Sequence, residues 1–86
     1  MDAKAVAALK ESLAELQKGN VRFARLVTIC EKHFGEGRTT GSHHIFKVPW
    51  AGEPRINIQK VKGGKAKEYQ VLQVVAALSK LVLLHS

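Results

Sequence analysis

The chain has 86 residues, of which 45% are hydrophobic, and a formal net charge of +7 at pH 7. This length allows one small hydrophobic core, and the composition excludes wholesale disorder, because disordered chains are poor in apolar residues. A single cysteine excludes an internal disulfide. No apolar run is long enough to span a bilayer, and acidic residues near the N-terminus interrupt any signal peptide. We expect one compact domain in the cytoplasm, away from membranes.

Positive charge is concentrated in the middle of the chain. Residues 38–67 carry seven Lys or Arg and one Glu, whereas residues 1–37 have a net charge of +1 and residues 68–86 have none. This concentration suits a polyanion, because phosphates supply much of the free energy of nucleic-acid binding through counterion release. The alternative is a solvated basic surface with no partner.

Two amphipathic helices are predicted at the start of the chain, over residues 3–18 and 21–34. Their apolar side chains recur at intervals of three or four residues, which is the helical repeat. Gly19 and Gly35 follow the two repeats, and glycine is a residue that often ends a helix. The apolar positions are Val6, Leu9, Leu13 and Leu16 in the first helix, and Phe23, Leu26, Val27, Cys30 and Phe34 in the second.

After the second helix the pattern changes to that of strands. A short strand is predicted near residues 38–40, and two more over residues 42–48 and 55–61, with the turn-forming segment PWAGEP between the last two. A basic, glycine-containing loop then leads into a third amphipathic helix over residues 67–82. This order predicts an α+β domain in which helices cover one face of a small three-stranded antiparallel sheet.

Strand alternation separates two adjacent histidines. His44 shares its face with Phe46 and Val48, which suit the core, so we expect His44 to point towards the helices. His43 then points outward together with Lys47. An outward imidazole among cations can meet a phosphate and exchange a proton near neutral pH, although an inert surface histidine is the alternative. The residues expected across the hairpin from His43 are Arg55, Asn57 or Gln59.

The hexapeptide GSHHIF, residues 41–46, follows a helix ending in Phe34 and Gly35 and precedes another strand and a helix. In this context it resembles the HicA (YcfA-like) family of toxin–antitoxin systems, over about residues 21–81. The resemblance implies a double-stranded-RNA-binding-domain-like fold, with an α-β-β-β-α domain over residues 21–86 and an extra helix over residues 1–20. It also implies an mRNA-cleaving, metal-independent endoribonuclease that a HicB-type antitoxin silences.

The family motif is Gly-Ser-His, then about two variable residues and an aromatic residue, and its histidine is essential for RNA cleavage. By this resemblance the catalytic residue is His43, acting as general acid or base without a cofactor, and the aromatic is Phe46. Family members usually carry a Pro-x-His-like segment after the third strand; residues 59–64 here keep only the basic turn. The residues predicted to bind nucleic acid are Arg38, Ser42, Lys47, Arg55, Lys60, Lys62, Lys65 and Lys67.

Other interpretations stay open. A non-catalytic RNA-binding module would use the same fold and basic surface. A metal-dependent nuclease would need Cys30, His33 and the two strand histidines as ligands, but Cys30 falls in an apolar stripe and the strand histidines point oppositely. An apolar setting also disfavours Cys30 as a nucleophile, because it raises the thiol pKa. The stripe of the first helix either enlarges the core or forms a docking face for the antitoxin or a second copy.

Overall fold

The computed structural model describes residues 3–51 and 55–85, which form three helices and three strands. The order confirms the predicted α+β class, and no helix in these ranges is long and apolar enough to cross a membrane. The elements are α1 (Ala3–Gln17), α2 (Phe23–Phe34), β1 (Arg38–Thr40), β2 (His43–Phe46), β3 (Ile56–Gln59) and α3 (Glu68–His85).

Some predicted boundaries were wrong. β2 and β3 are shorter than the predicted strands over residues 42–48 and 55–61. β2 ends at Phe46, shortly before Pro49, which cannot donate a backbone hydrogen bond to a sheet. The third helix continues to His85 instead of stopping at residue 82, since the leucines there are good helix formers even though they are exposed. Part of the predicted PWAGEP turn, residues 52–54, lies outside the described residues.

The sheet has the strand order β1-β2-β3, and both neighbouring pairs are antiparallel. Gly41 and Ser42 connect β1 to β2, and the φ of +59° at Gly41 is the positive value that a type II′ hairpin turn requires at this position. A β-carbon on Gly37 would lie 2.6 Å from a ring carbon of Phe46. Glycine at this position therefore lets the chain pass close to a core aromatic ring.

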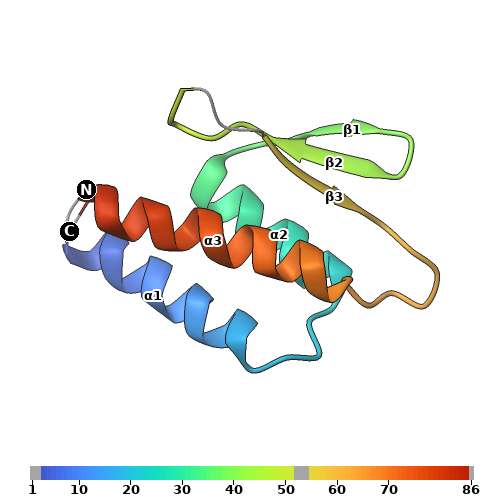
Figure 1. The fold of residues 1–86 in the computed structure, drawn as a ribbon, viewed down its shortest axis with the longest axis horizontal. Helices are drawn as coiled ribbons and strands as arrows, with labels where there is room; N and C mark the ends of the chain where they lie inside the picture. The colour runs from blue at the N-terminus through green and yellow to red at the C-terminus, as the bar shows by residue number, and fades with distance from the viewer. Residues whose placement is uncertain (1–2, 52–54, 86) are drawn as a thin grey trace.

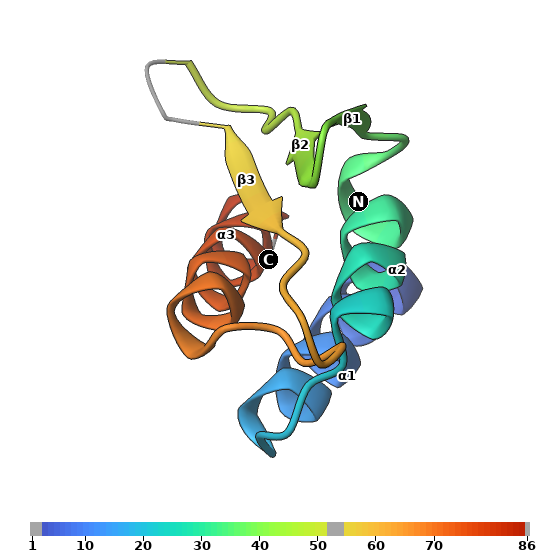
Figure 2. The same cartoon turned by 90° about the vertical axis from the view of Figure 1, so that its right-hand side faces the viewer.

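All three helices lie on the same side of the sheet (Figures 1 and 2). α2 and α3 are adjacent to the sheet, and α1 forms the layer farthest from it, against α3. Among the described residues, no helix lies over the opposite face of the sheet. The buried hydrophobic residues are Leu9, Leu16, Phe23, Leu26, Ile29, Cys30, Phe46, Ile56, Ile58, Val71, Val74, Ala77, Leu78 and Leu81.

The apolar stripe of α1 contributes to this core, because Leu9 and Leu16 are both buried in it. Polar contacts also join α1 to α2. Ser12 Oγ lies 2.9 Å from His33 Nε2. At the surface, the Arg25 guanidinium donates two hydrogen bonds to the Glu15 carboxylate, at 2.6 and 2.8 Å. The burial of Leu9 and Leu16 agrees with the prediction that the apolar stripe of α1 enlarges the core.

Two glutamines of α3 cover the edge of β3 that faces away from β2. With the Gln70 amide assigned in the orientation that satisfies both of its ends, the side chain pairs with the backbone of Gln59. Its amide nitrogen then lies 3.2 Å from the carbonyl oxygen and its amide oxygen 3.0 Å from the backbone nitrogen. Gln73 Oε1 accepts a hydrogen bond of 2.8 Å from the backbone N–H of Asn57. These side chains satisfy backbone groups that an open sheet edge would expose.

Candidate functional site

The two adjacent histidines point to opposite faces of the sheet, as strand alternation predicts. His44 lies on the helix side, where its ring packs edge-on against the ring of Phe23, with the centroids 5.3 Å apart. Its strand partner is the buried Ile58. His43 pairs with Gln59, and strand alternation directs its side chain to the face opposite that of His44. Both rings are half-buried, and His43 is the one on the outer face of the sheet.

A hydrogen bond from the neighbouring strand orients the His43 ring. His43 Nδ1 lies 3.0 Å from Asn57 Oδ1. An amide oxygen can only accept, so Nδ1 carries the proton in this contact and Nε2 of the neutral ring keeps its lone pair. The Asn57 backbone is in turn bound by Gln73 of α3. The strand and the helix together hold an imidazole whose Nε2 can act as a base.

Asn57 had no assigned role in the sequence prediction beyond being one of three neighbours expected across the hairpin. Its alternation with Ile56 and Ile58 indicates that it faces outward, and this is the available sequence signal. The pairing of Asn57 with Ile45, diagonal to His43, depends on the β2–β3 register. That register cannot be read from strand alternation alone.

Ser42 lies next to His43 in the hairpin turn and is tied to the end of β3. Its carbonyl oxygen accepts a 2.9 Å hydrogen bond from the backbone N–H of Lys60. Its hydroxyl accepts a 3.3 Å hydrogen bond from the Gln59 amide nitrogen. These contacts place the start of β2, the end of β3 and two predicted nucleic-acid-binding residues together.

Three of the predicted cations converge on the outer side of the sheet. Arg38, Lys47 and Arg55 surround a hollow of about 400 Å³ that also includes Ile45, which is two residues from His43 on the same face of β2. We call this the cationic hollow. Glu36 also lines it and reduces its net positive charge. The lining residues come from the end of the α2–β1 connection, from β1, from β2 and the residue after it, and from the approach to β3.

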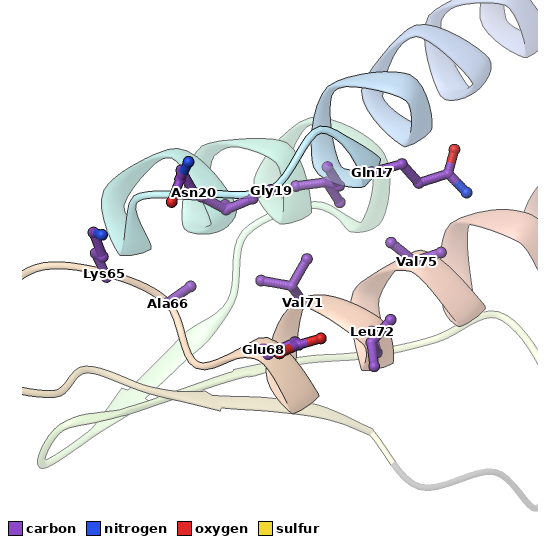
Figure 3. A pocket seen from close by; sticks show the side chains of 11 residues that line it. Gln17, Gly19, Asn20, Lys65, Ala66, Glu68, Val71, Leu72 and Val75 are labelled. Atoms are coloured by element: carbon purple, nitrogen blue, oxygen red, sulfur yellow. The ribbon is translucent and has the colours of Figure 1, made fainter.

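The remaining predicted cations do not join this group. The backbone of Lys65 forms an isolated antiparallel β-bridge with that of Arg22. Lys65 lines a different hollow of about 520 Å³, between the end of α1 and the start of α3 (Figure 3). Lys67 lies 5.7 Å from the ring centroid of Tyr69. Lys62 is exposed in the turn that precedes Lys65. The structure therefore brings Arg38, Lys47 and Arg55 together and places Lys65 and Lys67 elsewhere.

A third hollow, of about 550 Å³, lies beside β3 and α3. We call it the Trp50 hollow, and its lining includes Val48, Trp50, Arg55, Asn57, Gln73 and Lys80. Lys80 Nζ lies 4.6 Å from the centroid of the Trp50 ring. Sequence reasoning missed this site, because Trp50 falls in a turn segment and Lys80 in a distant helix.

The residues considered for metal binding or thiol chemistry are not brought together. Cys30 is buried, and this burial raises the pKa of its thiol to about 12, so the thiol stays protonated near neutral pH. Burial, and to a lesser extent Lys32, lowers the pKa of His33. Within residues 3–51 and 55–85, no three His, Cys, Asp or Glu side chains form a group that could hold a metal ion.

Comparison of the chain with protein-family models, with curated proteins and with solved structures finds no match.

Proposed function

We propose that this chain is an RNA-cleaving toxin of the HicA type, a metal-independent endoribonuclease that acts on mRNA. The observation that carries the proposal is the outward His43, whose Nδ1 is bound by Asn57 Oδ1 at 3.0 Å on a sheet face without a helix over it. The cationic hollow on the same face supplies groups that attract phosphate. An oriented base beside cations suits cleavage of a phosphodiester.

The proposed fold relationship is to double-stranded-RNA-binding domains. It rests on the order α2-β1-β2-β3-α3 and on the position of both helices on one side of the antiparallel sheet. In this interpretation residues 21–86 form the family domain, and residues 1–20 add the helix that α3 packs against. The proposed location is the cytoplasm, where mRNA and a HicB-type antitoxin would be the partners.

In the proposed reaction, Nε2 of His43 accepts the proton of an RNA 2′-hydroxyl. The 2′-oxygen bonds to the adjacent phosphorus, the bond from phosphorus to the 5′-oxygen of the next nucleotide breaks, and that oxygen takes up a proton from water. The products carry a 2′,3′-cyclic phosphate and a 5′-hydroxyl, and His43 returns its proton to water. DNA has no 2′-hydroxyl and is not a substrate for this step.

The cationic hollow would stabilise the charge that develops on the phosphate oxygens. Arg38 and Arg55 present planar guanidinium groups that can donate paired hydrogen bonds to phosphate, and Lys47 adds a compact positive charge. Preorganised cations of this kind lower the energy of the transition state more than that of the bound substrate. Glu36 would disfavour a second phosphate at the same place.

The decisive test is cleavage of a 5′-labelled RNA by the purified chain in the presence of EDTA, beside a DNA of the same sequence. We expect the RNA alone to be cut, with cyclic phosphate ends. His43→Ala should slow cutting by about 10²- to 10⁴-fold, the usual contribution of a general acid or base. His85→Ala is the matched control, because His85 is an exposed histidine at the end of α3.

The same test separates the enzyme from a non-catalytic RNA-binding module. If wild type and His43→Ala bind RNA equally and neither cuts it, the chain is a binding module and the proposal is wrong. Loss of cutting in EDTA would reject the metal-independent mechanism. Inducible expression in a bacterium extends the test, since wild type should arrest growth and fragment mRNA whereas His43→Ala should not.

A further inference from the structure

The only tryptophan of the chain lies half-buried where the sheet meets α3. Its ring lies beside the Trp50 hollow, and the Lys80 ammonium approaches it to 4.6 Å from the centroid. Arg55 lines the same hollow as a second cation, and no Asp or Glu of the described residues lines it. The hollow therefore places an aromatic ring and two basic side chains together.

Two residues connect this hollow to the candidate site on the sheet. Arg55 lines both the Trp50 hollow and the cationic hollow. Asn57 lines the Trp50 hollow and also binds Nδ1 of His43 through its side-chain oxygen. A chain of nucleotides with one phosphate at the cationic hollow would therefore find the Trp50 hollow beside it.

The chemistry of the lining fits an unpaired nucleobase. Proteins that bind single-stranded nucleic acid stack bases on aromatic side chains and hold the backbone with cations. The amide side chains of Asn57 and Gln73 also line the hollow, and amides can hydrogen-bond to the edge of a base. A volume of about 550 Å³ is within the range of small-ligand pockets.

We propose that the Trp50 hollow binds an unpaired base of the RNA, next to the nucleotide whose 2′-hydroxyl meets His43. This inference rests on the proposed RNA cleavage and adds a substrate preference to it. RNA that is single-stranded at the cut would be the substrate, because a base inside a duplex cannot stack on the indole. Duplex RNA of the same sequence should therefore be cut more slowly.

Fluorescence of Trp50 tests the inference directly, since the chain has no other tryptophan. The probe is a short, end-labelled 2′-O-methyl oligoribonucleotide, which cannot be cleaved because its 2′-oxygen carries no proton. Binding is followed by anisotropy of the label, and we expect the indole fluorescence to be quenched over the same concentration range. An abasic chain of the same length and charge should bind without quenching.

Variants of the full chain provide the second measurement. Trp50→Leu should weaken binding of the oligoribonucleotide by about tenfold, and Trp50→Phe, which keeps a ring, by less than about threefold. The matched control is Tyr69→Leu, which removes another aromatic ring with a lysine over it, 60% exposed at the start of α3. This control should bind as wild type does. Circular dichroism checks that each variant is folded.

The outcomes distinguish this inference from the proposed function. If wild type cuts RNA and binds the oligoribonucleotide, but its fluorescence does not change, the base does not stack on Trp50 and only the further inference is overturned. Equal quenching by the abasic chain overturns it in the same way, even if Trp50→Leu does not fold. If wild type neither binds nor cuts RNA, both proposals are wrong.

Discussion

The inner and outer faces of the sheet consist of alternate residues of the same strands. On the inner face, Phe46, Ile56 and Ile58 are each at most 2% exposed and pack towards α2 and α3. On the outer face, Asn57 is exposed and binds the half-buried His43. The comparison indicates that the two faces have separate roles, since the inner face stabilises the fold and the outer face can change with smaller effects on folding.

The adjacent histidines give the same comparison within one strand. His44 contacts the ring of Phe23, and His43 contacts the side-chain oxygen of Asn57. Their chemical type is identical, so the difference arises from the direction in which each Cβ leaves the strand. A catalytic role can therefore be proposed for one histidine without being extended to its neighbour.

The largest effect should come from truncating the inner face. Phe46→Ala removes a ring that is 1% exposed and should lower the free energy of unfolding by about 3–5 kcal/mol. Ile45→Ala, one position away on the outer face, should lower it by less than about 1 kcal/mol. Urea unfolding followed by circular dichroism measures both values. Equal losses for the two variants would contradict the division between the faces.

A smaller effect is expected at the edge of β3, where Gln70 and Gln73 bind the strand backbone. Gln70→Leu leaves the backbone N–H and carbonyl of Gln59 without their side-chain partner, at a position where Gln70 is 2% exposed. Leaving buried polar groups unpaired costs about 1–3 kcal/mol. Gln73→Leu is the matched comparison, and it should cost less because water can reach the exposed N–H of Asn57. Urea unfolding that gives the reverse order would contradict this account of the edge.

Features that depend on neighbours along the chain could be predicted from the sequence. The helical repeats located the three helices, and strand alternation placed His44 towards the core and His43 outward, as the structure has them. Both patterns arise because each side chain has a direction set by its own backbone. Burial of Cys30 followed from its place in the stripe of α2.

Features that depend on segments distant in the chain could not be predicted. Asn57 meets His43 only through the β2–β3 register, and Trp50 meets Lys80 only because α3 returns along the edge of the sheet. Lys65 was grouped with the other cations by sequence position, but its backbone β-bridge with Arg22 holds it beside α1 and α3. Net charge by segment does not report such separations in space.

The smallest effect concerns His33, whose pKa is lowered by burial and, to a lesser extent, by Lys32. His33 lies between α1 and α2, and burial lowers its pKa from the ordinary 6.5. Because the unfolded chain binds the proton more tightly, stability is fully present above about pH 6.5 and is lost as the pH falls from there towards the pKa in the folded chain.

The variant His33→Gln keeps a polar group near Ser12 but cannot titrate in this range. Between about pH 7.5 and about pH 5, we expect the free energy of unfolding of this variant to fall less than that of wild type. This difference should be smaller than the losses expected for Phe46→Ala and Gln70→Leu. Urea unfolding at both pH values measures the difference. Parallel pH dependence in the two proteins would mean that burial between the helices does not disfavour the charged imidazole.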